Sequence, residues 1–469
     1  MARVSSGVAR SFRLCQPARL CAALFLCLHL CLTSASAQGS NGLLQRLERA
    51  AALVRDDRLA EAEKEIASVM KVAPEEAGAL NLLGTVRARQ GRLDEAEALF
   101  LRAVRSDASF VAPHMNLAYL YMLKRAPEKT IQELREVLRL DPRNADAGGK
   151  LAQLLFSSNQ TDEGIRLVER LKEQSPPLSA ALLAALGDAY ASRSDFEKAE
   201  ESYLLAVRQQ DNNVDAILGL ARTAHARGDG AGAARQLARA RQLVAASPDL
   251  LYRFAGVALR LNFGGEASAA LAKALELKPD EPAYLLLQGV AWLSKPDVFE
   301  AEKSFRRFIE LRPDNAQGQM LLGYALLKQK RSAEARAWLE KSIKTELNMP
   351  EPFYYLGLIA QEQNEDLRAV ELLEKAVKIL PTYAHAHTAL GASYLKLKNL
   401  QRAQQELELA VKLNPEDSKA HYNLALLYAR LKEPARAQEQ MRIVEKLKST
   451  SKAGGAEAEA FAPAPAPPR

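Results

Sequence analysis

Cysteine is missing from nearly the whole of this 469-residue chain. All four cysteines, Cys15, Cys21, Cys27 and Cys31, lie within the first 31 residues. The rest of the chain can therefore form no disulfide framework and offers no thiolate for catalysis or for metal binding. The early cysteines lie in or beside an apolar run, and we interpret them as apolar filler.

The chain beyond residue 37 also lacks a large excess of charge of one sign. Residues 1–37 hold four arginines and no acidic residue, which leaves 60 basic against 57 acidic residues and a net charge of +3 beyond them. A surface of mixed sign has no general attraction for nucleic acid, so we expect no nucleic-acid partner. Aromatic residues are only 6% of the chain, and the abundance of Ala, Leu, Glu, Lys and Arg favours helix.

The first 37 residues predict a targeting signal. A basic stretch leads into the apolar run Leu20–Thr33, and the small residues Ala35 and Ala37 follow it. As a helix this run would span about 21 Å, less than a hydrocarbon core of about 30 Å. We expect a cleaved signal peptide at 1–37, a short linker at 38–42, and a periplasmic or secreted protein. There are two alternatives. Residues 20–33 could stay as an anchor, which would be the only link to a membrane, or the segment could be an organelle transit peptide.

A period of 34 residues organises the chain from Leu43 to Ser451. The rows begin at residues 43, 77, 111, 145, 180, 214, 248, 282, 316, 350, 384 and 418, with one extra residue near Ser179. Row position 20 is Ala in ten rows, and row position 24 is apolar or aromatic in all of them. Row position 8 is always Gly or Ala: Ala50, Gly84, Ala118, Ala152, Gly187, Ala221, Ala255, Gly289, Gly323, Gly357, Gly391 and Ala425.

These spacings predict two helices in each row. Row positions 4, 7, 8 and 11 share one stripe of a first helix, and positions 20, 24 and 27 share one stripe of a second. Small residues at positions 8 and 20 allow the two helix backbones to approach closely. Polar residues and Gly, as in Arg89–Glu95, indicate the turn between the helices. A proline that closes seven of the rows disfavours helix at the residue before it.

The arrangement of Leu390, Gly391, Tyr394, Ala403 and Pro415 on this period resembles the tetratricopeptide repeat (TPR). The resemblance implies an all-α protein, an α-solenoid of about twelve helix-turn-helix repeats in a right-handed superhelix whose first helices line a concave groove. Rows 145–178 and 214–247 fit least well, because they lack Gly at position 8. Row 214–247 also lacks the closing proline.

No stretch remains for a catalytic domain, because the signal, the linker, the array at 43–451 and an Ala/Pro-rich tail at 452–469 account for the chain. We expect this tail to be disordered. Three short motif matches have plainer explanations. Gly228–Gly232 follows no strand, His385 and His387 lie too close on a helix to point the same way, and Ser68–Lys71 matches S-x-x-K by letters alone. We predict no enzymatic activity, no cofactor and no metal.

The first-helix row positions 2, 5, 9 and 12, opposite the packing stripe, hold many apolar and aromatic residues. Tyrosine and methionine adapt to varied partners, and an apolar strip on a soluble protein indicates an interaction surface. Packing between neighbouring repeats is the alternative explanation. The residues that we predict to bind a partner are Met115, Tyr119, Arg222, Tyr252, Leu286, Met320, Tyr324, Tyr354, Leu358 and Tyr422.

These observations favour an exported, non-enzymatic scaffold that binds proteins or peptides. Neither the two-carboxylate clamp nor the asparagine ladder known in the family is present: Tyr354, Leu358 and Thr388 occupy clamp positions, and Asn116 and Asn423 are isolated. The arginines of row 214–247 suggest a separate patch for an acidic partner. An accessory subunit of envelope polysaccharide synthesis or export, and a self-assembling structural rod, are the alternative functions.

Overall fold

The computed structural model describes residues 40–174, 177–295 and 297–453. Within these residues every regular element is an α-helix, and there are 24 of them. The predicted signal peptide and most of the predicted tail lie outside the described residues. The first helix begins at Ser40, inside the predicted linker, and the last runs to Ala453, just beyond the predicted array. None of the described helices is both long and apolar enough for a membrane span.

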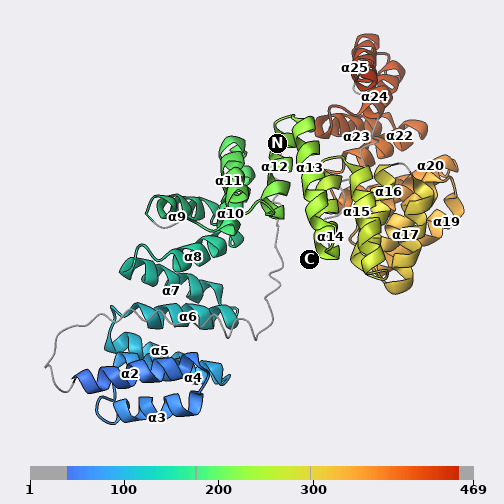
Figure 1. Cartoon of the computed structure of the whole chain (residues 1–469). Helices are drawn as coiled ribbons and strands as arrows, with labels where there is room; N and C mark the ends of the chain where they lie inside the picture. Colours follow the sequence, from blue (N-terminus) through green and yellow to red (C-terminus); the bar gives the residue numbers. More distant parts are fainter. Residues whose placement is uncertain (1–39, 175–176, 296, 454–469) are drawn as a thin grey trace. The chain divides into compact units, whose positions relative to one another are not determined.

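The chain divides into two compact units between Gln236 and Leu237, inside helix α13 (Gly230–Val244). The helices of the first unit are α2 (Ser40–Arg55), α3 (Leu59–Met70), α4 (Ala77–Arg89), α5 (Leu93–Ser106), α6 (Val111–Leu123), α7 (Pro127–Leu140), α8 (Ala145–Ser157), α9 (Thr161–Gln174), α10 (Ala180–Ser192), α11 (Phe196–Gln209) and α12 (Val214–Ala226) (Figure 1). The division falls in row 214–247, one of the two rows that fit the period least well.

The second unit is built from the helices that follow α13. They are α14 (Pro248–Arg260), α15 (Gly264–Leu277), α16 (Pro282–Ser294), α17 (Val298–Leu311), α18 (Ala316–Lys328), α19 (Ser332–Thr345), α20 (Pro350–Glu362), α21 (Asp366–Ile379), α22 (Ala384–Lys396), α23 (Leu400–Leu413), α24 (Ser418–Arg430) and α25 (Pro434–Ala453). From α2 to α11 and from α14 to α25, an even-numbered helix packs against the odd-numbered helix that follows it, and each such hairpin packs on the next. From α4 onward the even-numbered helices begin at the residues where the 34-residue rows begin.

In every hairpin except α16–α17, the turn contains one residue in the left-handed backbone region. Glycine takes this place at Gly91 and Gly228, with φ of 78° and 80°, and a polar residue takes it elsewhere, as at Asn262 and Lys398. The next amide bonds back five residues, as Asn399 N–H does to the carbonyl of Tyr394 at 2.9 Å. This bond satisfies a carbonyl that the end of the first helix would otherwise leave unpaired.

The predicted small-residue contacts hold the hairpins together. A Cβ added to Gly84 would lie 2.6 Å from the ring of Phe100, and one added to Gly391 would lie 2.6 Å from Leu407. These are contacts between row positions 8 and 24 of one hairpin. Ala403, at row position 20, is fully buried, and its carbonyl lies 3.4 Å from the same added Cβ of Gly391. Because protein cores are close-packed, a larger side chain at position 8 would force the two helices apart.

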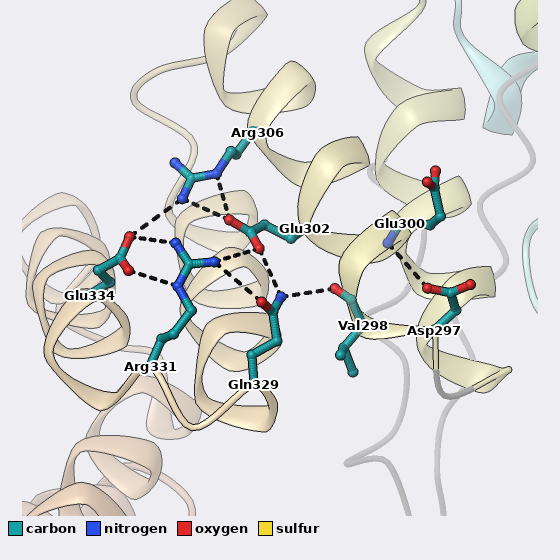
Figure 2. Close-up of polar contacts among 8 residues, drawn as sticks. All are labelled: Asp297, Val298, Glu300, Glu302, Arg306, Gln329, Arg331 and Glu334. Atoms are coloured by element: carbon teal, nitrogen blue, oxygen red, sulfur yellow. Dashed lines mark hydrogen bonds and ion pairs between the residues drawn. The ribbon is translucent and has the colours of Figure 1, made fainter.

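A polar network joins two neighbouring hairpins of the second unit (Figure 2). Glu302, on α17, accepts hydrogen bonds from Arg306 on its own helix and from Gln329 and Arg331 in the turn between α18 and α19, each at 2.8 Å. The amide of Gln329 also donates to the carbonyl of Val298 at 3.1 Å. Burial by itself would raise the pKa of Glu302, but these hydrogen bonds outweigh it and lower the pKa. The carboxylate therefore stays charged and fixes the register of the two hairpins.

Candidate functional site

The predicted binding residues fall into three groups by exposure. Met115, Leu286 and Met320 are at most 7% exposed and lie in the cores, so they offer no surface to a partner in this structure. Tyr422 is 46% exposed. The others are partly buried: Tyr119, Arg222, Tyr252, Tyr324, Tyr354 and Leu358. Among these ten residues, the three buried ones all lie at row position 5, whereas those at position 9 (Tyr119, Arg222, Tyr324 and Leu358) keep partial access to solvent.

In the first unit the partly buried residues are held by charged neighbours. The hydroxyl of Tyr119 donates to Asp146 at 2.7 Å, and the ammonium of Lys150 lies 5.2 Å from the centre of its ring. Arg222 donates to Asp188 at 2.5 Å and to the hydroxyl of Tyr203 at 3.3 Å. Burial would lower the pKa of Arg222, but Asp188 raises it, so the guanidinium stays charged. Arg222 is therefore committed to an ion pair inside the unit.

The remaining arginines of row 214–247 have partners as well. Arg227 pairs with Glu200 at 2.5 Å, and Arg235 lies 3.8 Å from Asp229. Arg241, which belongs to the second unit, pairs with Glu266 at 2.8 Å. Solvent-exposed pairs of this kind are weak and could be displaced by a stronger ligand. The structure nevertheless gives the predicted acidic-partner patch little uncompensated positive charge.

In the second unit, tyrosines of successive hairpins contact one another. Tyr252 stacks on Tyr284, with ring centres 5.2 Å apart. A larger group, which we call the tyrosine cluster, consists of Tyr324 on α18, Tyr354 and Tyr355 on α20, and Tyr383 immediately before α22. Their ring centres are 4.9 Å apart for Tyr324–Tyr355, 5.2 Å for Tyr354–Tyr355 and 5.1 Å for Tyr354–Tyr383. The cluster therefore links α18, α20 and the residue before α22, which belong to three consecutive hairpins.

The two buried tyrosines of the cluster, Tyr355 and Tyr383, have raised pKa values. Burial raises the pKa of Tyr355 well above its ordinary value, and the neighbouring tyrosines and Glu351 raise it further. Burial, followed by Tyr354, Glu351 and Tyr324, has the same effect on the pKa of Tyr383. Tyr324 and Tyr354 are partly accessible, so the cluster reaches the surface.

One polar atom of the cluster has no partner. The hydroxyl oxygen of Tyr383 is buried and forms no hydrogen bond with any of the described residues. Other buried tyrosines donate to a carboxylate: Tyr203 to Asp188 at 2.8 Å and Tyr428 to Glu408 at 3.0 Å. Most buried polar groups in proteins are paired, so an orphan hydroxyl indicates a place where a ligand group can bind.

The last hairpin leaves a second apolar area uncovered. Tyr422 and Leu426 on α24 are 46% and 39% exposed, and Met441 on α25 is 37% exposed. Met441 occupies row position 24, where Leu407 and Phe305 are fully buried in earlier rows. These side chains are exposed because no further hairpin packs on α24 and α25 within the described residues.

The short motifs are placed in structural roles. His387 lies between Glu406, 2.6 Å from Nδ1, and the carbonyl of Pro381, 3.0 Å from Nε2. His385 lies instead 3.7 Å from Asp417, so the two histidines do not share a ligand. Gly228 is in the turn that follows α12. No group of three or more His, Cys, Asp or Glu side chains in the described part of the chain could hold a metal ion.

The sequence pattern predicted two members of the tyrosine cluster, Tyr324 and Tyr354, and did not predict the other two. Tyr324 and Tyr354 lie at row positions 9 and 5, which we predicted to lie on the first-helix face opposite the packing stripe. Tyr355 and Tyr383 lie at positions 6 and 34, outside that pattern. Glu351 was missed as well, although it precedes Tyr354 and Tyr355 by three and four residues, the spacing that places side chains on one helix face.

Comparison with known families agrees with the repeat geometry. Profiles described as tetratricopeptide repeat match residues 47–109, 121–187, 252–306, 297–352, 358–421 and 406–439. The chain belongs to the tetratricopeptide repeat family, and each unit is an α-solenoid of such repeats. The predicted fold class is therefore confirmed. The comparison with curated protein sequences gives no match.

Several solved structures are similar to the chain at low identity. Yeast Tom70 is 16% identical, with 90% of this chain and 97% of that chain covered and a TM-score of 0.41. Cut9 with Hcn1, an APC/C hetero-tetramer, is 14% identical, with coverages of 88% and 94% and a TM-score of 0.43. MamA from Desulfovibrio magneticus RS-1 is 22% identical, with coverages of 36% and 97% and a TM-score of 0.32.

Proposed function

We propose that this protein is an exported, non-enzymatic scaffold that binds protein or peptide partners along the first-helix face of its second unit. The observation that carries the proposal is the partly accessible apolar and aromatic surface made by Tyr324, Tyr354 and Leu358, together with the exposed Tyr422. Aromatic rings bury a large area at a low entropic cost, and a preformed helical surface limits the ordering needed on binding.

The proposal is tested by comparing first-helix with second-helix positions. A photo-crosslinking aromatic amino acid is placed at Leu358 or Tyr422, and in controls at Leu367 or Phe299. Leu367 matches Leu358 in residue type, and Phe299 is an aromatic counterpart of Tyr422. The two controls are 73% and 71% exposed, on the second helices α21 and α17. The chain is expressed in its natural host, irradiated, and its crosslinked products are separated by mass.

We expect discrete crosslinked products from Leu358 and Tyr422 and none, or only a diffuse background, from Leu367 and Phe299. Equal products from both faces, or none from the first-helix face, would contradict the proposed binding surface. The intact mass of the chain recovered in the same experiment reports on export. A chain that begins at Gln38 supports a cleaved signal, and one that retains Leu20–Thr33 supports an anchor instead.

A further inference from the structure

The hydroxyl of Tyr383 is the starting point for a more specific site. Tyr383 is only 7% exposed, and its oxygen has no hydrogen-bond partner among the described residues. A buried hydroxyl without a partner destabilises the fold, and phenylalanine would pack its ring equally well. The hydroxyl therefore has no hydrogen-bonding role within the described chain, and a ligand group is a candidate for its partner.

Glu351 supplies the second, independent observation. It lies in the first turn of α20, three and four residues before Tyr354 and Tyr355, and is partly buried. No ion pair or hydrogen bond joins its side chain to another described residue, whereas Glu302, Glu374 and Glu406 all have partners. The spacing of Glu351 places it on the face of α20 that carries Tyr354 and Tyr355, and its charge adds to the raised pKa of Tyr355 and of Tyr383. The nearest cation on the cluster, the ammonium of Lys328, lies over the ring of Tyr324 and forms no ion pair with Glu351.

We propose that Glu351 and the tyrosine cluster bind an arginine side chain presented by an extended segment of a partner protein. Glu351 would accept from the guanidinium, the Tyr383 hydroxyl oxygen would accept a second N–H, and the Tyr354 ring would provide a stacking face. This inference rests on the proposed function, because it names the group that the first-helix face recognises.

The chemistry of the site favours arginine over other side chains. A guanidinium is planar, keeps its charge when partly buried, and carries five donors that can reach a carboxylate and a hydroxyl together. It also stacks on aromatic faces, where the ring quadrupole attracts the cation. A lysine ammonium is more strongly hydrated and cannot stack. A neutral side chain would leave Glu351 uncompensated in a partly buried place, which is costly.

Cations already lie over tyrosine rings elsewhere in the chain. The ammonium of Lys328 is 5.6 Å from the ring centre of Tyr324, and the guanidinium carbon of Arg402 is 5.5 Å from that of Tyr394. In the second case the arginine also pairs with Glu374 at 3.1 Å and bonds the tyrosine hydroxyl at 2.8 Å. This group of arginine, tyrosine and glutamate is the arrangement that Glu351, Tyr354 and Tyr383 would complete with an external arginine.

The test uses the full chain with carbon-13 labels in its tyrosine rings. The probe is a blocked five-residue peptide, glycine–alanine–arginine–alanine–glycine, and the matched control carries citrulline, a neutral isostere of arginine. Both are titrated at the same concentrations while the tyrosine ring resonances are followed by NMR. We expect the arginine peptide to shift the resonances of Tyr354, Tyr355 and Tyr383 in a saturable way and to leave Tyr203, in the first unit, unchanged.

Two variants separate binding from folding. Glu351→Gln should lower the affinity for the arginine peptide about tenfold, because a charged hydrogen bond is lost. Tyr383→Phe should lower it about threefold, because an ordinary hydrogen bond is lost. Neither should lower the thermal unfolding midpoint. Equal shifts with arginine and citrulline, no shifts in the cluster, or a midpoint lowered by Tyr383→Phe would each overturn the arginine site.

Failure here is distinguishable from failure of the scaffold proposal. The crosslinking positions Leu358 and Tyr422 do not belong to the tyrosine cluster. If they still capture discrete partners while the arginine peptide produces no shifts, the first-helix face binds a different chemistry. If neither experiment succeeds, both the site and the binding surface are wrong.

Discussion

The two units use the same row position in opposite ways. At row position 9 of neighbouring first helices, the first unit places Asp188 and Arg222, which pair at 2.5 Å and enclose the hydroxyl of Tyr203. At that position the second unit places Tyr324 and Leu358, and Tyr324 contacts Tyr355 through its ring. The repeating backbone brings the same positions together in both units. Which side chains meet decides whether the contact is a closed ion pair or an aromatic surface.

This difference separates a structural contact from a candidate binding site. In the first unit Asp188, Tyr203 and Arg222 bond one another, so a ligand would have to break existing bonds. In the second unit Glu351 lacks a cation and Tyr383 lacks a hydrogen bond within the described chain. A ligand that supplies both would meet no internal competition, which is why we place recognition in the second unit.

The largest expected effect tests what the two units share. Gly84→Leu in the first unit and Gly391→Leu in the second should each cost about 3 kcal/mol or more, because the new side chain would meet Phe100 or Leu407. Both tryptophans, Trp292 and Trp338, lie in the second unit. Denaturant unfolding followed by tryptophan fluorescence therefore reports on that unit, and circular dichroism reports on both.

The matched controls are Gly42→Leu and Gly265→Leu, at helical glycines with open space around the added Cβ. These should be neutral or stabilise by up to about 1 kcal/mol, because leucine favours helix more than glycine does. If Gly84→Leu and Gly391→Leu are as well tolerated as these controls, the packing rule inferred for both units is wrong.

A smaller effect should distinguish the units. Tyr203→Phe removes a hydroxyl that bonds Asp188 at 2.8 Å and Arg222 at 3.3 Å, and should cost about 1 to 2 kcal/mol of unfolding free energy. Tyr383→Phe removes a hydroxyl without a described partner, and should cost nothing or stabilise slightly. Urea unfolding of the two variants measures both values. Equal losses of unfolding free energy in the two variants would show that the Tyr383 hydroxyl has a structural partner, and the proposed difference between the two units would be wrong.

The smallest effect concerns pH within the second unit. Burial would lower the pKa of His387, but hydrogen bonds to Glu406 and to the Pro381 carbonyl raise it overall. Since the folded pKa exceeds the unfolded value of about 6.5, this contribution is fully present below that pH and is lost as pH rises through the folded pKa. The midpoint of unfolding, followed by tryptophan fluorescence, should therefore fall as the pH rises from about 6.5 through the folded pKa of His387.

Another histidine of the same unit provides the control. His421 has the same geometry but faces the amide of Gln440, at 2.6 Å, in place of a carboxylate. Glu406→Gln copies that arrangement at His387 and should flatten the pH dependence above about 6.5. A slope unchanged by Glu406→Gln would mean that His387 does not titrate as described.

Much of the fold was predictable because it depends on local and periodic features. Gly391 and Ala403 are small at every repeat of their row positions, and the structure buries both against the neighbouring helix of their hairpin. The helix starts follow the same period because turn residues and prolines act on the backbone next to them. The signal peptide and the absence of enzymatic activity stay predictions.

The site was less predictable because exposure depends on the neighbouring hairpin. Met320 and Tyr354 both occupy row position 5, yet Met320 is buried and Tyr354 is partly accessible. Tyr383 lies at the end of its row, where a sequence pattern predicts only a connection. Its contact with Tyr354 depends on how the α21–α22 connection turns back onto α20, which no local spacing reveals.

The amino-acid sequence alone determined the 34-residue period, the helical hairpin and the positions that must be small, because close helix packing excludes large side chains wherever it recurs. Only the tertiary structure decided which first-helix side chains remain accessible and that the compact units divide within α13. It also decided that, among the described residues, Tyr383 has no hydrogen-bond partner and Glu351 has no ion pair. The reason is physical: burial and hydrogen bonding depend on atoms that lie a whole repeat away in the chain.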